Sequence, residues 1–297
     1  MKKICVLMST YNGEKYLEEQ LKSIINQRNV EVDILIRDDG STDNTFKILE
    51  KYSKNYKNIT YYTGKNLRSA QSFMDLIYSC DEYEYYAFAD QDDVWDLDKL
   101  EIGIRYLNKD YHLYGCKKRI VDQNLNLLNQ EDEFPHNLEL GSILLRCYIS
   151  GCTMVFDNFL RKKILEYEPK IISMHDSWVL KVAFCIGKIY YDKEPHIDYR
   201  QHENNVVGAK KNILIRLKKK ICFSNNRNLN IRTKMAKELY IGYGKYLNEK
   251  EKKLLYYFSH SKEKRIYRLK IIRENFLQVN DFFEKIRVMI YFLLGKI

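Results

Sequence analysis

Three carboxylates stand within four residues at Asp90, Asp92 and Asp93, directly after the apolar run Tyr-Ala-Phe-Ala at 86–89. Carboxylates this close repel one another, and placing them beside a buried strand costs free energy unless a cation compensates them. Their oxygens suit Mg²⁺ or Mn²⁺, ions that commonly bridge to the phosphates of a substrate. The segment therefore predicts a metal-diphosphate site, and the alternative is a solvated acidic turn before a helix.

A second acidic turn, Asp-Asp-Gly-Ser-Thr-Asp, occupies residues 38–43. A carboxylate placed just after a strand can accept hydrogen bonds from a pyrimidine N–H or from ribose hydroxyls. Gly40 permits a tight turn, and Ser41 or Thr42 can cap the next helix. The same residue types also form ordinary turns, so both interpretations stay open.

Two later segments supply further polar groups. Asp176 lies in Met-His-Asp-Ser-Trp at 174–178, where a helix is expected to begin. It is either a common first-turn acid or the base that takes a proton from an acceptor hydroxyl. Arg200 and His202 lie in the polar segment 199–205, and His202 could bind metal or diphosphate, although a lone histidine is usually structural.

The elements that would position these groups alternate between short apolar runs and helical patterns, as in βαβ units with a largely parallel sheet. The expected strands are 4–8, 32–36, 59–62, 85–89, 113–121 and 152–156, with two more near Ile189 and Ile197. The expected helices are 16–25, 41–52, 69–78, 97–107 and 175–185, followed by a helical region from residue 213 onward. Ligands of open α/β sheets collect at the carboxyl ends of strands, where the polar segments above are expected to meet.

Composition limits the class of protein. The chain has 297 residues, 45% of them hydrophobic, which is enough for a sizeable core. Its seven cysteines form no CxxC pair and no zinc-like spacing, so reduced thiols in a cytoplasmic protein are expected. The first apolar run, 4–8, is too short for a signal peptide, and no stretch reaches the roughly 18 apolar residues of a membrane helix.

Positive charge is concentrated in the last third of the chain, where residues 209–297 carry 23 Lys and Arg against 7 Asp and Glu. A nucleic-acid-binding role is one interpretation, because Lys and Arg clusters neutralise phosphates. The basic residues are, however, interleaved with acids and with apolar residues at helical spacing. We therefore expect no nucleic-acid partner and a peripheral membrane contact of basic amphipathic helices, with ordinary solvated Lys and Arg as the alternative.

Taken together, these segments resemble family-2 glycosyltransferases of the GT-A fold, in the rhamnosyltransferase subgroup, over residues 4–208. The segments that carry the resemblance are Ser-Thr-Tyr-Asn-Gly-Glu-Lys-Tyr-Leu-Glu-Glu-Gln-Leu at 9–21, Arg-Asp-Asp-Gly-Ser-Thr-Asp at 37–43, Asp-Gln-Asp-Asp-Val-Trp at 90–95, Ser-Gly-Cys-Thr-Met at 150–154, His-Asp-Ser-Trp at 175–178 and Tyr-Arg-Gln-His-Glu-Asn-Asn-Val-Val-Gly at 199–208. Each is weak alone, and all six in this order are specific. One departure is Arg68, where the family often has glycine after Asn-Leu.

The resemblance implies a Rossmann-like α/β domain of GT-A fold at 1–208 and a basic helical appendage at 209–297. Asp176 would be the general base, and Arg200 would lie near the diphosphate. The nucleoside would be held by Thr10, Tyr11, Asp39 and Asp92. The ligands of Mn²⁺ or Mg²⁺ would be Asp90, Asp92, Asp93 and His202. The remaining residues of the diphosphate and sugar pocket would be Gly151, Cys152, Thr153, His175 and Trp178.

The reaction implied is a single inverting displacement, in which an acceptor hydroxyl attacks the anomeric carbon of a nucleoside-diphosphate sugar. The rhamnosyltransferase subgroup implies dTDP-L-rhamnose as sugar donor and a glycan or lipid-linked glycan as acceptor. A cytoplasmic protein is expected, and the basic helices would bring it to the inner face of the cell membrane. The nearest rival uses a UDP-hexose or UDP-N-acetylhexosamine with the same machinery. A rival of another class is a non-catalytic protein that binds glycans or nucleotide sugars, against which the intact Asp92, Asp93 and Asp176 argue.

Overall fold

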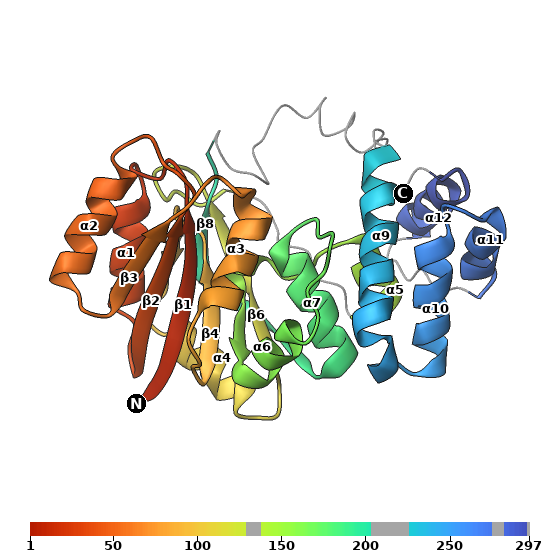
Figure 1. Ribbon diagram of the computed structural model, residues 1–297, viewed down its shortest axis with the longest axis horizontal. Coiled ribbons are helices and arrows are strands. Elements are labelled where there is room, and N and C mark those ends of the chain that lie inside the picture. The colour runs from red at the N-terminus through yellow and green to blue at the C-terminus, as the bar shows by residue number, and fades with distance from the viewer. Residues whose placement is uncertain (129–137, 203–225, 275–281, 296–297) are drawn as a thin grey trace.

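A computed structural model describes residues 1–128, 138–202, 226–274 and 282–295. Its centre is a mixed eight-stranded sheet in the order β3-β2-β1-β4-β7-β6-β8-β5 (Figure 1). The strands are β1 (Lys2–Thr10), β2 (Val30–Asp38), β3 (Ile59–Thr63), β4 (Tyr85–Ala89), β5 (Val94–Trp95), β6 (Leu113–Val121), β7 (Val155–Asp157) and β8 (Ile189–Arg200). Strands β1 to β4 are parallel, β7 is antiparallel to β4 and β6, β8 is parallel to β6, and β5 is antiparallel to β8.

Helices connect the strands and cover both faces of the sheet. Those of the first two thirds are α1 (Leu17–Ile25), α2 (Thr45–Asn55), α3 (Arg68–Ser79), α4 (Lys99–Leu107), α5 (Leu140–Leu145), the 3-10 turn η1 (Gly151–Thr153), α6 (Asn158–Leu165) and α7 (His175–Ile186). Those of the last third are α9 (Asn226–Tyr243), the 3-10 turn η2 (Gly244–Tyr246), α10 (Glu249–His260), α11 (Arg265–Arg273) and α12 (Phe282–Leu293).

The two faces of the sheet belong to two hydrophobic clusters, as alternation along β1 illustrates. Ile4, Val6 and Met8 pack with residues of α1, α2 and α4, whereas Cys5 and Leu7 pack with residues of α3, α6 and α7. Successive side chains of a strand point to opposite faces, so a strand covered on both sides is apolar throughout. This is why residues 4–8 form an uninterrupted apolar run.

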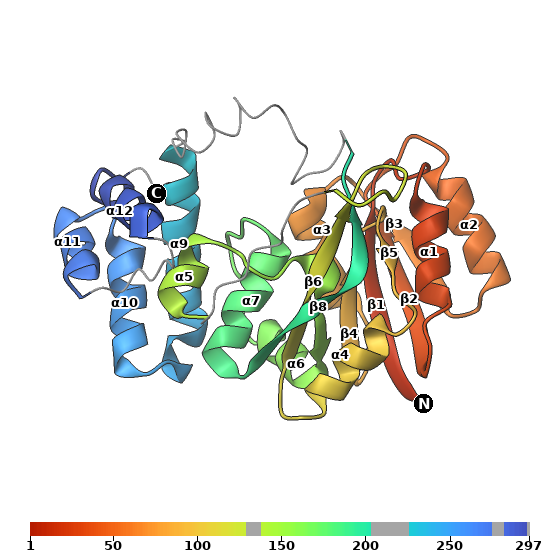
Figure 2. The same ribbon diagram turned by 180° about the vertical axis from the view of Figure 1, so that it is seen from behind.

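The C-terminal helices stand beside α7 and α5 at the end of the molecule remote from β3, as both views in Figures 1 and 2 show. Their core is continuous with that of the sheet. Tyr243 of α9 is fully buried and packs edge-on to Trp178 of α7, with ring centroids 5.9 Å apart. The expected boundary at 208 falls within residues 203–225, outside the described part of the chain, and stays a prediction.

The predicted alternation of strands and helices is confirmed through α4, and the helical C-terminal region is confirmed for the described residues. Three expectations are corrected. The strand expected at 152–156 is the 3-10 turn η1 followed by the shorter β7, and the two strands expected near Ile189 and Ile197 are the single strand β8. The helix expected at 41–52 begins at Thr45, because the amide and hydroxyl of Ser41 both donate to Asp38 and hold a turn there.

Among the helices of the described residues, none combines the length and apolar character needed to cross a membrane.

Candidate active site

The acidic segment after β4 lies beside the segment after β1, because the two strands are parallel neighbours with Met8 opposite Ala89. Gln91 joins the two segments: its Oε1 accepts from the Tyr11 amide at 2.8 Å, and its Nε2 donates to the Tyr11 carbonyl at 3.0 Å. A Cβ at Gly13 would lie 2.4 Å from the same Oε1, so a side chain there would displace the Gln91 amide from this position. The two polar segments singled out in the sequence are therefore one rigid edge.

Asp90 and Asp93 bring their carboxylates together with the Cys152 thiol of η1, and one ligand atom from each lies within 4.8 Å of the others. Burial and then the carboxylates of Asp92 and Asp176 raise the pKa of Asp90 to about 7. Asp93 is fully buried, and burial followed by the charges of Asp92 and Asp90 raises its pKa well above the usual range. The carboxylates of Asp90 and Asp93 therefore lack enough nearby positive charge among the described residues to compensate them.

A divalent cation fits this arrangement. The Oδ2 atom of Asp93 is buried with no hydrogen-bond partner among the described residues, which is costly for an oxygen that carries charge. Carboxylates are the ligands of Mg²⁺ and Mn²⁺, whereas a thiol is not a preferred one. Asp90 and Asp93 are therefore the residues suited to hold such an ion.

Asp92 is not in that group of ligand atoms, although its charge raises the pKa of both Asp90 and Asp93, and its role as a metal ligand stays a prediction. Its Oδ2 lies 2.8 Å from Nε2 of His202, which the chain places just after β8. The ring of His202 packs on Tyr16, with ring centroids 4.9 Å apart. His202 thus anchors Asp92 from a distant part of the chain.

Arg200, expected near the diphosphate, is bound to protein groups in this structure, and its contact with the diphosphate stays a prediction. It is 2% exposed, and its guanidinium donates to the carbonyls of Asp92 at 2.8 Å and Gln123 at 2.6 Å and pairs with Glu19. Its backbone amide donates to Asp93 at 3.1 Å. The Arg200 side chain therefore positions the acidic segment by donating to the carbonyl of Asp92.

Asp176 begins α7 and lies next to the acidic group, since its charge contributes to the raised pKa of Asp90. Its Oδ1 accepts from the Ser177 amide at 2.6 Å, and its Oδ2 accepts from the Gly151 amide at 3.2 Å. A Cβ at Gly151 would lie 2.5 Å from Nε2 of His175, so only glycine allows η1 to approach α7 this closely. The carboxylate is therefore oriented by backbone amides and is only partly buried.

The residues expected to contact the nucleoside differ in whether their side chains are exposed and free to bind a ligand. Tyr11 is 47% exposed and offers its ring to a ligand. Thr10 is fully buried and its hydroxyl donates to Asp38 at 3.0 Å. The Asp39 carboxylate accepts from Arg37 and from the amides of Leu67 and Arg68, which engages its lone pairs. Contact of Asp39 with a nucleoside stays a prediction that requires some of these bonds to open.

Three residues expected in the sugar pocket are buried, and their contact with a sugar stays a prediction. Trp178 is fully buried and its ring faces Tyr243. His175 is 3% exposed and stacks on Phe73 with ring centroids 3.9 Å apart. Thr153 is fully buried and its hydroxyl donates to the Ser150 carbonyl at 2.8 Å. Their side chains support the walls of the site, because helical and 3-10 spacing turns them inward.

Lys118 is a site residue that the sequence did not single out. Its ammonium donates to Ser150 Oγ at 2.6 Å, lies 4.8 Å over the ring of Tyr199, and lowers the pKa of the neighbouring Asp90. In the sequence it is one of several basic residues at 117–119, and only the pairing of β6 with β8 places it at the acidic group.

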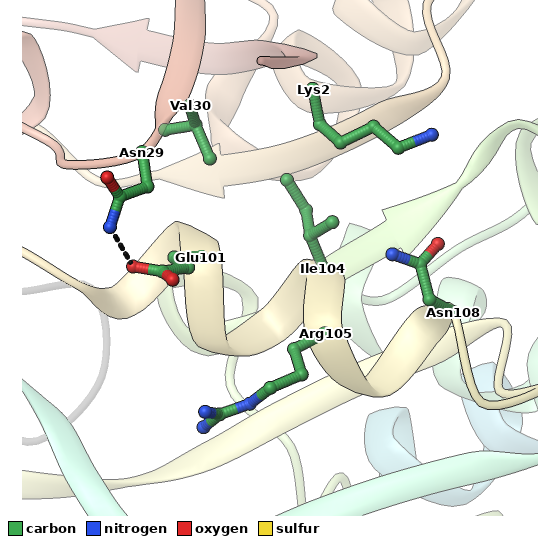
Figure 3. Close-up of a pocket in the computed structure, with 7 residues that line it drawn as sticks. All are labelled: Lys2, Asn29, Val30, Glu101, Ile104, Arg105 and Asn108. Carbon is green, nitrogen blue, oxygen red and sulfur yellow. Dashed lines mark hydrogen bonds between the residues drawn. The ribbon is translucent and has the colours of Figure 1, made fainter.

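A surface hollow of about 280 Å³ lies at the opposite edge of the sheet, near the amino ends of β1 and β2 (Figure 3). It is lined by Lys2, Asn29, Val30, Glu101, Ile104, Arg105 and Asn108. The Asn29 amide donates to the one acid in it, Glu101, at 2.8 Å. With no paired carboxylates, this hollow lacks the chemistry found at the carboxyl edge.

Comparison with known proteins agrees with this arrangement. The family model described as glycosyl transferase family 2 matches residues 5–168. The dTDP-rhamnosyl transferase RfbG of Shigella flexneri is 34% identical over 227 residues, covering 68% of this chain and 74% of that protein. The UDP-Glc:alpha-D-GlcNAc-diphosphoundecaprenol beta-1,3-glucosyltransferase WfgD of Escherichia coli is 29% identical over 160 residues, covering 53% of this chain and 61% of that protein.

Solved structures resemble the fold. The crystal structure of S. aureus TarS in complex with UDP-GlcNAc superposes with a TM-score of 0.64 and 21% identity, covering 91% of this chain and 76% of that one. The mannosyltransferase PcManGT of Pyrobaculum calidifontis, in complex with GDP-Man and Mn²⁺, does so with a TM-score of 0.53 and 12% identity, covering 99% and 85%. With the family model matching more than half of its length, this chain is a glycosyltransferase that belongs to family 2 and has the GT-A fold.

Proposed function

We propose that this enzyme transfers L-rhamnose, with inversion, from dTDP-L-rhamnose to a hydroxyl of a glycan or lipid-linked glycan in cell-surface polysaccharide biosynthesis. The observation that carries the catalytic part is the position of Asp176, a partly buried carboxylate oriented by two backbone amides beside the acidic group. The similarity to a dTDP-rhamnosyl transferase supports the choice of sugar. Similarity to a UDP-glucosyltransferase and to an abequosyltransferase of Salmonella typhimurium supports a second candidate, the same reaction with another sugar donor.

In the proposed reaction Asp176 is the base. The acceptor hydroxyl oxygen forms a bond to the anomeric carbon as the bond from that carbon to the diphosphate oxygen breaks. The hydroxyl proton passes to the Asp176 carboxylate, and the nucleoside diphosphate leaves with the electron pair. The amides of Gly151 and Ser177 hold the carboxylate in one orientation, so that little ordering is needed at the moment of proton transfer.

The leaving diphosphate needs positive charge. Mn²⁺ or Mg²⁺ held by Asp90 and Asp93 would supply part of that charge when bound. The Lys118 ammonium, which already offsets the charge of Asp90, is the protein's own cation at this place. Asp92, fixed by His202, would accept from a ribose hydroxyl, and the exposed ring of Tyr11 would stack on the pyrimidine.

The proposed location is the cytoplasm. The six cysteines of the described residues are free thiols, five of them buried, as is usual in a reducing compartment. A contact with the inner face of the membrane is a separate proposal, because it depends on a different surface of the molecule.

A panel of sugar donors tests the proposal. The purified enzyme is incubated with Mn²⁺ or Mg²⁺ and, in parallel, with dTDP-L-rhamnose, UDP-glucose, UDP-galactose and UDP-N-acetylglucosamine, and the released nucleoside diphosphate is measured. Preferred release of dTDP supports the rhamnosyl donor, and preferred release of UDP supports the second candidate. No release from any donor, together with tight binding of one, would favour a non-catalytic nucleotide-sugar-binding protein. Omission of the metal in each reaction tests the role given to Asp90 and Asp93.

A further inference from the structure

Helix α12 presents apolar side chains on two sides. On one side Phe292 is buried and stacks on Phe258 of α10, with ring centroids 5.6 Å apart. On another side four apolar residues are exposed, by 41% at Ile286, 50% at Ile290, 42% at Leu293 and 59% at Leu294. Spacings of four, seven and eight residues place these four on one stripe of the helix. The core therefore uses only part of the apolar surface of α12.

Helix α11 also exposes apolar side chains. Ile266 and Leu269 are 51% and 53% exposed. Between them in the sequence, Arg268 donates to the Ser261 carbonyl at 2.6 Å and to the Leu293 carbonyl at 3.3 Å, which ties α11 to the end of α12. Figures 1 and 2 place both helices at the end of the molecule remote from β3. We call these six exposed apolar residues and the exposed basic residues of α11 the α11–α12 surface.

The charge of helix α11 is positive. Arg265, Lys270 and Arg273 are exposed on α11, which contains no acidic residue. The acid that follows it, Glu274, pairs with Lys253 of α10 at 3.1 Å. Exposed Ile and Leu flanked by Arg and Lys are characteristic of helices that lie in the interface of a bilayer with anionic lipids.

We propose that the α11–α12 surface binds anionic phospholipid headgroups and holds the enzyme reversibly on a membrane. The Arg and Lys side chains would contact the lipid phosphates, while the Ile and Leu side chains enter the boundary between headgroups and acyl chains. A second copy of this chain fits the surface less well, because an interface with twofold symmetry would bring the same positive charges together. The proposal goes beyond the sugar-transfer reaction, since it uses none of the residues of the active site.

Vesicle flotation of the full-length protein tests this inference. We expect the protein to float with vesicles of phosphatidylcholine and phosphatidylglycerol, to float about tenfold less with phosphatidylcholine alone, and to be released by added salt, which screens the charges. The double variant Ile290→Asp/Leu294→Asp, which places charge on the apolar stripe, is expected to lose about tenfold or more of the floating fraction. Arg265→Glu/Arg273→Glu is expected to remove the preference for phosphatidylglycerol.

The matched control is Ile241→Asp on α9, which places the same charge at a residue that is 59% exposed outside the α11–α12 surface. It is expected to float like the wild type. Thermal unfolding and donor-dependent release of nucleoside diphosphate in detergent-free solution are measured for every variant, so that loss of lipid binding is separated from loss of fold and from failure of the proposed reaction. Equal flotation of the wild type with both kinds of vesicle, unchanged flotation of the two double variants, or a dimer that Ile290→Asp/Leu294→Asp dissociates would each overturn the proposal.

Discussion

Nε2 of His202 lies 2.8 Å from Oδ2 of Asp92, joining the residue after β8 to the acidic segment after β4. The two residues are 110 positions apart in the chain. Ligand atoms of Asp90 and Asp93 group with Cys152, and Asp92 lies close enough for its charge to raise the pKa of both carboxyl groups. His202 therefore holds the Asp92 carboxylate in one orientation beside the other two.

The variant His202→Ala should weaken the use of the metal. Without the imidazole, Asp92 loses the partner that fixes its carboxylate, so the acidic segment that carries Asp90 and Asp93 is less well ordered for a cation. Residues that orient the groups of a metal site through hydrogen bonds usually contribute about 10- to 100-fold in metal affinity or activity. We expect the Mn²⁺ concentration for half-maximal donor turnover to rise by about that factor. His260→Ala, on α10, is the control, and equal effects of the two variants would contradict the role given to His202.

The variant Asp176→Asn should abolish most of the turnover. Loss of a positioned base typically costs about 10²- to 10⁴-fold in rate, and we expect this fall in kcat with little change in the KM for the sugar donor. Asp157→Asn is a matched control, because Asp157 also begins a helix and accepts from a backbone amide, that of Leu160 at 2.9 Å. If both variants lost activity equally, the effect of Asp176→Asn would be due to the loss of a helix-capping interaction and not to the loss of a base.

The variant Arg68→Gly should stabilise the fold. Arg68 has a φ of 64°, a left-handed conformation that costs a side-chain-bearing residue about 1–2 kcal/mol and glycine almost nothing. Glycine is also more flexible in the unfolded chain, which offsets about 0.5–1 kcal/mol of the gain. We expect a net rise of about 0.5–1 kcal/mol in the free energy of unfolding by urea. Arg68→Ala keeps the strain and should not gain; equal stability of the two variants would mean that the strain is absent.

Burial lowers the pKa of His175 to about 4, from an ordinary value near 6.5. Between these pH values the unfolded chain binds a proton that the folded chain does not, so stability falls as the pH falls from 6.5 to 4 and then levels off. The full effect is about 3 kcal/mol. Other groups titrate in the same range, among them Asp90, so the informative quantity is a difference between proteins.

The comparison is with His175→Gln, which cannot titrate. Unfolding free energies of the wild type and the variant, measured from pH 7 to pH 4, should converge by about 3 kcal/mol as the wild type loses stability. The variant is less stable at pH 7, since glutamine cannot stack on Phe73 as the imidazole does. A constant difference across this range would show that His175 titrates normally in the folded protein.

Much of the fold follows from the sequence, because β1 and β4 are buried on both faces and thus appear as apolar runs between helical patterns. Short elements were missed: β5 has two residues and α5 has six, too few for a period to be recognised. Within the site, the sequence identified the acidic segment, Asp176 and His202 because carboxylates and imidazoles at strand and helix ends are distinctive by residue type alone.

What the sequence determined by itself was which groups are available and roughly where the elements that carry them begin and end, since both depend on neighbours within a few residues. Only the tertiary structure decided how those groups are used. Arg200 pairs with Glu19 and donates to backbone carbonyls, and the Trp178 side chain is buried in the core. Lys118 lies close enough to Asp90 for its charge to lower the pKa of that carboxyl group. These outcomes depend on strand order, register and helix packing, which bring together residues tens to hundreds of positions apart and are not encoded in any local pattern.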